Sequence, residues 1–139
     1  IIAIHPAPIV DLLEKGYIPV VSTLGCDKQG NVYNINADTA AAHIAAALKA
    51  ESLINLTDTK GVLADAKDPA SLITRIRLDE IAKLKSSGVI SGGMIPKLEC
   101  CAHAVEQGAN RAFIIDGRVP HSILIEMLTD EGIGTMVTA

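Results

Sequence analysis

Aromatic residues are scarce in this chain, which has one Phe, two Tyr and no Trp among 139 residues. The net charge is −4, and no basic run with interleaved aromatic residues occurs. Both absences argue against a nucleic-acid surface, which needs positive charge and stacking side chains. Nearly half of the residues are hydrophobic, so we expect one domain with an aliphatic core.

Long apolar runs are also absent. The longest, residues 37–48, is interrupted by polar side chains, so we expect no membrane-spanning segment. The apolar start has no basic region and soon reaches His5 and Pro6, so we expect no secretory signal. Because the chain begins with Ile1, we expect a processed or truncated product.

Metal-ligand spacing is missing among the cysteines and histidines. The three cysteines, Cys26, Cys100 and Cys101, form no CxxC pair, and two adjacent helical residues point about 100° apart. We expect buried thiols in a reducing compartment. The four histidines show no metal spacing either: His5, His43, His103 and His121. His43 and His103 are expected to be packing or surface residues.

Apolar runs and helical spacing alternate along the chain. The expected strands are residues 17–24, 31–35, 52–57, 72–76, 111–115 and 134–138. The expected helices are residues 6–15, 36–49, 78–87, the stretch from Pro96 to Gly108, and residues 121–128. This alternation predicts an α/β fold with a mainly parallel sheet, in a single domain over residues 1–139. Ligands bind such sheets where strands end and helices begin, at residues 34–38, 57–61 and 92–97 here.

The third junction contains a lysine in an unusual place. Gly92 and Gly93 lead into Pro96, which suits the first turn of a helix, and Lys97 falls in that turn. A helix start favours anions, so a lysine there is unfavourable unless an anion lies against it. Glycines, free N–H groups and one ammonium describe a phosphate site. The alternative is a glycine-rich turn before an ordinary amphipathic helix with a solvated lysine.

The other two junctions leave alternatives open. Asn34, Asn36 and Asp38 share one face if the chain is extended, which suits amides that bind a small polar ligand and a carboxylate that orients a lysine. Alternatively, Asn36 and Asp38 cap a helix. Thr57 and Asp58 could contact a nucleotide or start a turn. Neither a Walker A motif nor GxGxxG after a strand is present, and no Ser/His/Asp set can be argued.

Four motifs in a fixed order carry a family resemblance. They cover residues 33–38 (YNINAD), 56–63 (LTDTKGVL), 92–97 (GGMIPK), and 114–118 (IIDGR) with residues 121–122 and 132–136 (GIGTM). Together they closely resemble the carboxyl-terminal half of the acetylglutamate kinases, members of the amino-acid kinase family. The likeness covers nearly the whole chain. GGMIPK followed by Cys100 and Cys101 resembles the arginine-inhibited branch of cyanobacteria and plastids.

The resemblance implies phosphoryl transfer from ATP, with Mg²⁺, to the side-chain carboxylate of N-acetyl-L-glutamate in arginine biosynthesis, in the cytoplasm or plastid stroma. Lys97 would contact the ATP phosphates, and Asp38 would organise the catalytic lysines. Asn34 and Asn36 would contact acetylglutamate. The implied nucleotide-binding residues are Thr57, Asp58, Gly61, Val62, Leu63, Ser91, Gly92, Gly93, Met94 and Lys97. The resemblance gives no protein metal ligand.

The chain departs from the family in lacking the amino-terminal half, which carries a glycine-rich loop, a second catalytic lysine and most of the acetylglutamate pocket. We therefore expect absent or very weak catalysis by this chain alone, and homo-oligomers of the full enzyme. Part of an arginine inhibitor site would lie near His121, Glu126 and Gly134. The PII signalling protein is an implied partner, but His103 replaces an arginine of that branch. Two alternatives stay open: a non-catalytic nucleotide- or partner-binding module, and another amino-acid kinase.

Overall fold

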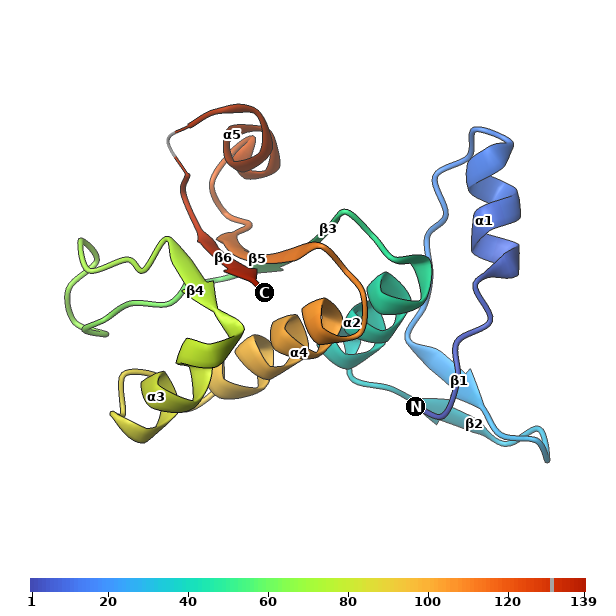
Figure 1. Ribbon diagram of the computed structural model, residues 1–139. Coiled ribbons are helices and arrows are strands. Elements are labelled where there is room, and N and C mark those ends of the chain that lie inside the picture. Colours follow the sequence, from blue (N-terminus) through green and yellow to red (C-terminus); the bar gives the residue numbers. More distant parts are fainter. Residues whose placement is uncertain (131) are drawn as a thin grey trace.

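The computed structural model describes residues 1–130 and 132–139. The elements are α1 (Ala7–Glu14), β1 (Leu24–Cys26), β2 (Val32–Asn34), α2 (Ala37–Leu48), β3 (Ser52–Thr57), β4 (Arg75–Arg77), the 3₁₀ helix η1 (Leu78–Glu80), α3 (Ile81–Ser86), α4 (Met94–Glu106), β5 (Arg111–Asp116), α5 (Ser122–Leu128) and β6 (Thr135–Thr138). Figure 1 shows their arrangement around a central sheet. Among the described residues, none of the helices has the length and apolar character needed to cross a membrane.

Four strands form the central sheet in the order β3–β5–β6–β4. β3 runs parallel to β5, and their last residues, Thr57 and Asp116, are paired. β4 runs parallel to β6, while β5 and β6 are antiparallel. The prediction of an α/β fold with a mainly parallel sheet is therefore confirmed, and the carboxyl ends of β3 and β5 meet at one edge.

Two long helices, α2 and α4, lie side by side against the sheet (Figure 1). Their buried contact faces carry small side chains, such as Ala42 and Ala45 of α2 and Ala104 of α4. Small side chains let two helices approach closely and fill the interior without voids. Leu98 of α4 and Ile114 of β5 are fully buried beneath them. The core is aliphatic, as predicted, and it contains residues of both helices and of β5.

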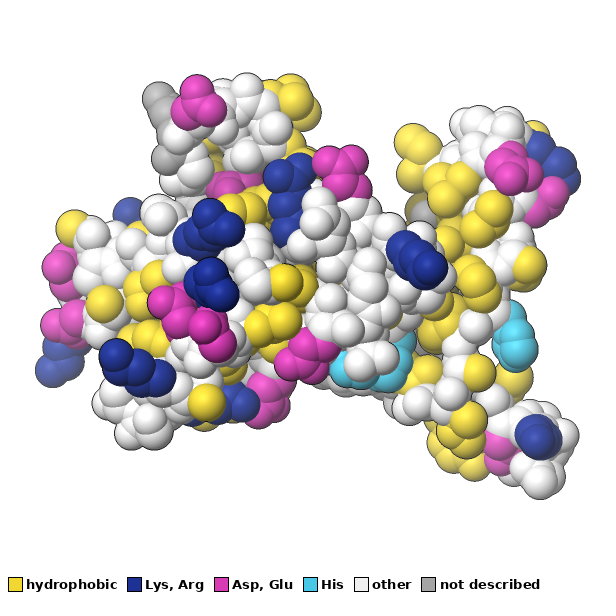
Figure 2. Space-filling view, viewed as in Figure 1, with side chains coloured by type: hydrophobic (Ala, Val, Ile, Leu, Met, Phe, Trp, Pro, Cys, Tyr) yellow, Lys and Arg dark blue, Asp and Glu magenta, His cyan; other side chains and the backbone are white. Residues whose placement is uncertain are grey.

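The amino-terminal segment, residues 1–35, stands apart from the sheet (Figure 1). The expectation of a buried strand at residues 17–24 is wrong, because residues 17–22 have no regular structure and only β1 pairs with β2. Ile18 and Val20 are 91% and 95% exposed. Pro19 removes a backbone donor, and within the described part of the chain these side chains stay exposed instead of packing against the sheet. Figure 2 shows the resulting hydrophobic surface over α1 and the hairpin.

The other predicted elements are present with shifted ends. The expected strand at residues 72–76 is β4, three residues long and displaced toward the carboxyl end. The expected helix at residues 78–87 begins as a 3₁₀ turn before α3. α4 starts at Met94, so Pro96 is its third residue, still within the first turn. Such shifts of a few residues are normal, because helix ends are defined by caps rather than by periodicity.

Candidate functional site

Lys97 and Asp38 meet although 59 residues separate them in sequence. Lys97 lies in the first turn of α4 and Asp38 in the first turn of α2. The Nζ–Oδ2 distance is 3.0 Å, and each side chain is 29% exposed. The carboxylate of Asp38 is thus the anion that a lysine at a helix start requires, and the chain supplies it itself. The pair is open enough to solvent for a ligand to reach the ammonium.

The start of α4 lies beside this ion pair, but its first backbone donors are already hydrogen-bonded. The Met94 N–H donates to the Ser91 carbonyl and the Ile95 N–H to the Gly92 carbonyl, both at 3.3 Å, and Pro96 has no N–H. The N-cap of α4 is Gly93, with no side-chain capping bond, and Ser91 and Gly92 before it are exposed. Gly92 has φ of +55°, a conformation that favours glycine. The expectation of free N–H groups at this helix start is therefore wrong for Met94 and Ile95, and an anion there would meet the ammonium of Lys97 instead.

The two asparagines differ in their surroundings. Asn36 is the N-cap of α2, and its Oδ1 accepts a hydrogen bond from the Thr39 backbone N–H at 3.1 Å. Asn34 is the last residue of β2 and is exposed. The expectation that Asn34, Asn36 and Asp38 share the face of an extended segment fails, because α2 begins at residue 37. The capping alternative holds for Asn36, whereas Asp38 pairs with Lys97.

The stretch after β3, residues 57–63, divides into an exposed and a buried part. Thr57 Oγ1 accepts from the Thr59 N–H and donates to the Thr59 carbonyl, which forms a tight turn. Asp58 and Lys60 are exposed. Gly61 and Val62 are buried, with the Val62 N–H hydrogen-bonded to β6. The exposed turn therefore offers polar side chains at the carboxyl end of β3.

A charged cluster that the sequence prediction missed lies at the same edge. Asp116, at the end of β5, accepts hydrogen bonds from Arg118 at 2.8 and 2.9 Å. The pKa of Asp116 is lowered to about 2 by these bonds, by the Arg118 backbone N–H and by the charges of Arg118 and Lys60. Asp58 raises the pKa of Arg118 further. The IIDGR motif was a sequence signal for this cluster, but it gave no role to these residues.

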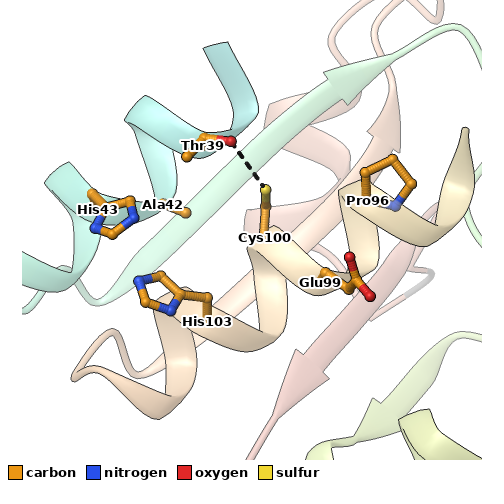
Figure 3. A pocket seen from close by; sticks show the side chains of 7 residues that line it. All are labelled: Thr39, Ala42, His43, Pro96, Glu99, Cys100 and His103. Atoms are coloured by element: carbon orange, nitrogen blue, oxygen red, sulfur yellow. Dashed lines mark hydrogen bonds between the residues drawn. The ribbon is translucent and has the colours of Figure 1, made fainter. Parts of the chain in front are cut away.

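A pocket of about 230 Å³ lies between α2 and α4 (Figure 3). Thr39 Oγ1 and Cys100 Sγ, 3.8 Å apart, mark its end near the ion pair. At its other end the rings of His43 and His103 are 4.4 Å apart and tilted by 50°. Burial is the main cause that lowers the pKa of His43, and the charge of His103 lowers it further. Both histidines are half-buried, with their rings in contact, which agrees with the expectation of packing or surface residues.

The thiols occupy three different environments. Cys101 is fully buried, accepts a hydrogen bond from Asn55 Nδ2 at 3.1 Å, and has a pKa raised by burial to about 12. Cys100 is half-buried, and Cys26 is exposed. The expectation of buried thiols is therefore right for Cys101 and wrong for Cys26. Within residues 1–130 and 132–139, no group of three His, Cys, Asp or Glu side chains could hold a metal ion.

The three residues predicted near a regulatory site lie around α5. Glu126 Oε2 accepts from the backbone N–H groups of Ile133 at 2.7 Å and Gly134 at 3.0 Å. Glu126 and Gly134 are therefore in contact. His121 is exposed and precedes α5 with φ of 60°. These hydrogen bonds connect α5 to the segment before β6. The regulatory role of the three residues stays a prediction.

These features define a class of protein: an α/β domain that presents a lysine–aspartate pair, at the starts of two helices, at the carboxyl edge of its sheet. Comparison with known proteins identifies the family. The family model described as "Amino acid kinase family" matches residues 1–116. The chain belongs to the amino acid kinase family.

Curated relatives that match over nearly the whole chain are acetylglutamate kinases. That of Heliobacterium modesticaldum is 53% identical over 137 residues, 99% of this chain and 46% of the relative. That of Thermosynechococcus vestitus is 57% identical over 129 residues, 93% of this chain and 44% of the relative. A solved structure, smu.665 from Streptococcus mutans, has 34% identity and a TM-score of 0.78, over 98% of this chain and 49% of that one. The chain thus spans about half the length of the curated relatives it matches.

Proposed function

We propose that this chain is the nucleotide-binding, carboxyl-terminal half of an acetylglutamate kinase, which transfers the terminal phosphoryl group of ATP to the side-chain carboxylate of N-acetyl-L-glutamate. The observation that carries the proposal is the Lys97–Asp38 pair at the starts of α2 and α4. The proposal places the protein in arginine biosynthesis, in the cytoplasm or plastid stroma.

The reaction needs charge neutralisation more than proton transfer. A side-chain carboxylate is ionised at neutral pH, so the nucleophile requires no general base. The site must instead hold the two anionic reactants together and balance charge as the phosphoryl group moves. Lys97 would contact the ATP phosphates through its ammonium. Asp38 would hold the ammonium in position through the 3.0 Å contact.

Two amides would recognise the acceptor. Asn34 is exposed at the end of β2, and both its amide groups can face a ligand. Asn36 uses its oxygen as the cap of α2, which leaves its NH₂ group to donate. Donors are what a carboxylate and an acetyl carbonyl require, so both asparagines fit acetylglutamate.

The nucleotide would lie across the stretches predicted to bind it. Residues 57–63 follow β3, and residues 91–94 lead into α4. Mg²⁺ usually keeps several waters and is bound by phosphates with one or two carboxylates. The exposed Asp58 could supply such a carboxylate, and the described residues hold no three-ligand metal site, so the phosphates would provide most of the coordination. The bound ion would neutralise phosphate charge during transfer.

The remainder of the enzyme would cover the exposed apolar surface of residues 1–35. The large side chains of this surface that are at least one-third exposed include Val10, Leu12, Leu13, Tyr17, Ile18, Val20, Val21, Leu24, Val32 and Tyr33. An apolar surface of this extent is typical of an interface. The missing part would complete the acetylglutamate pocket and supply the second lysine, so the chain alone would not turn over. Oligomerisation, arginine inhibition and PII binding are proposed for the whole enzyme only.

Titration calorimetry with MgADP tests the nucleotide site in this chain. We expect binding at millimolar nucleotide, weakened about tenfold or more in Lys97→Met, because one ammonium that contacts phosphate is lost. Lys83→Met is the matched control, since Lys83 is an exposed lysine on α3. Absence of binding, or equal binding by Lys97→Met and the unmodified chain, would count against the proposal.

A non-catalytic nucleotide- or partner-binding module is the second candidate. A module of this kind would bind MgADP but support no turnover when the rest of the enzyme is supplied. A substrate screen of the completed protein would separate acetylglutamate from the substrates of other amino-acid kinases.

A further inference from the structure

Thr135, the first residue of β6, connects two segments that are far from it in sequence. Its side chain is fully buried. Oγ1 accepts a hydrogen bond from the Val62 N–H at 2.8 Å and donates one to the Ile73 carbonyl at 2.7 Å. A hydroxyl has one hydrogen to donate and lone pairs to accept, so Thr135 satisfies a backbone donor and a backbone acceptor at once.

The two groups that Thr135 joins are the ends of one loop. The Ile73 N–H also bonds to the Val62 carbonyl at 2.8 Å, and Leu63 and Leu72 form an isolated antiparallel bridge. Residues 64–70 beyond this bridge are exposed. Thr135 therefore closes the base of the loop from the β6 side. The stretch 57–63 is fixed at one end by β3 and at the other by this hydroxyl.

Gly61 shows how closely the loop backbone lies against Thr135. Its φ is +141°, and an added Cβ would lie 2.6 Å from Thr135 Oγ1 and 3.1 Å from the Thr135 backbone nitrogen. Any other residue would therefore meet both backbone strain and a clash. The backbone at residue 61 is therefore confined by Thr135 and by the Leu72 side chain, whose Cδ1 would lie 3.0 Å from the added Cβ.

We propose that Thr135 is a positioning residue for nucleotide binding. It holds Gly61, Val62 and Leu63, three of the residues expected to line the nucleotide, without contacting the nucleotide itself. Loss of the hydroxyl would leave the buried Val62 N–H and the partly buried Ile73 carbonyl without this partner, and the buried N–H could reach water only by a movement of the backbone. This inference rests on the proposed function, because it assigns Thr135 to the same nucleotide site.

Three variants isolate the hydroxyl. Thr135→Val keeps the shape and removes both bonds, while Thr135→Ser keeps the hydroxyl. Thr138→Val is the matched control on the same strand, where the hydroxyl accepts only a 3.5 Å contact from exposed Arg75 among the described residues. The measurements are hydrogen exchange of the Val62 amide, followed by NMR, and MgADP affinity by calorimetry well below the melting temperature.

We expect Thr135→Val to accelerate exchange at Val62 about tenfold or more and to weaken MgADP binding by a similar factor. Thr135→Ser should keep most of the slow exchange at Val62 and most of the MgADP affinity. Thr138→Val should change neither the exchange rate nor the affinity. A purely structural role would lower the melting temperature and leave the MgADP affinity unchanged. Faster exchange with unchanged affinity, or an unchanged exchange rate, would overturn the positioning role while leaving the proposed function intact.

A second variant approaches the contact from the loop. Gly61→Ala presses a methyl group against the same hydroxyl, and Gly88→Ala is its control, since Gly88 has φ of +75° with nothing within 4 Å of an added Cβ. If Thr135→Val does not fold, weaker MgADP binding by Gly61→Ala than by Gly88→Ala supports the inference, and equal binding overturns it. If the unmodified chain itself binds no MgADP, both the proposed function and the positioning role are refuted.

Discussion

Acid should weaken the packing of α2 against α4 through the His43–His103 pair. The two rings lie 4.4 Å apart across the helix contact. Burial is the main cause that lowers the pKa of His43, followed by the charges of His103 and of the Ile1 amino terminus. The other ionisable groups of the pocket are Cys100 and Glu99, and Glu99 is paired with Lys85 of α3. The described residues thus give the histidines no free carboxylate partner.

The size of this loss of stability follows from the distance between the two rings. Two unit charges about 4.4 Å apart repel by about 4 kcal/mol at an effective dielectric constant of about 20, and by about 1 kcal/mol in water. Both side chains are half-buried beside an open pocket, so we expect a loss near the lower value. Because the folded-state pKa of His43 is below its ordinary value of 6.5, the unfolded chain binds protons first as the pH falls. The stability that neutral His43 contributes to the fold is present above pH 6.5. It is lost as the pH falls from there through the lowered pKa of His43.

Urea unfolding at about pH 7.5 and about pH 5.5 measures the effect. The free energy of unfolding should fall between these pH values by about 1 kcal/mol more in the unmodified chain than in His103→Gln or His43→Gln. His5→Gln, at an exposed histidine, should behave like the unmodified chain. Carboxylate titrations are common to all four proteins and cancel in this comparison. An identical pH dependence in all four would refute the reasoning.

Three further predictions concern the ion pair, the α5 contact and the thiols. A double-mutant cycle of Lys97→Met and Asp38→Asn in urea should give a coupling energy of about 1 kcal/mol, because the pair is partly buried and Asp38 offsets a cation at a helix start. Glu126→Gln should lower the free energy of unfolding by about 1–2 kcal/mol, since an ionised acceptor of two backbone N–H groups is lost. A thiol reagent should modify Cys26 rapidly in the folded chain and reach Cys101 only after unfolding, because that thiol is buried with its pKa raised.

Matched controls accompany these measurements. Lys83→Met with Asp38→Asn should give no coupling, and Glu106→Gln, at an exposed helical position, should leave the stability unchanged. Zero coupling between Lys97 and Asp38 would contradict the ion-pair argument. Equal rates of modification at all three cysteines in the folded chain would contradict the burial of Cys101.

Local patterns were enough to predict much of the fold. β3 and β5 are dense apolar runs bounded by polar turns. α2 is rich in alanine and begins after Asn36, whose side chain accepts the capping hydrogen bond from the Thr39 N–H. The residues at 17–24 have an equally strand-like pattern but remain exposed. Burial depends on what packs above a segment, and that information is not in the segment. The misprediction therefore falls where the chain lacks a packing partner.

The candidate site could be predicted only in part. The rule that ligands bind at the carboxyl ends of strands placed Asp38 and Lys97 near each other, and the structure brings them to 3.0 Å. The contacts of Thr135 with Val62 and Ile73 join residues more than sixty positions apart. No local pattern encodes such a contact, since it arises from the order of strands in the sheet. Asn36 is the opposite case, since its capping bond is local. The spacing of the residues nevertheless fitted both a helix cap and a ligand contact, so the sequence could not decide between these two hypotheses.

The most direct test of the account measures turnover in a completed protein. The part of the Heliobacterium modesticaldum relative that this chain does not cover would be fused to the chain, and ADP release would be followed with and without N-acetyl-L-glutamate. We predict release that depends on acetylglutamate, falls about a hundredfold or more in Lys97→Met, and is unchanged in Lys83→Met. A folded fusion that binds MgADP but releases no ADP with acetylglutamate, or one that keeps full activity in Lys97→Met, would contradict the account.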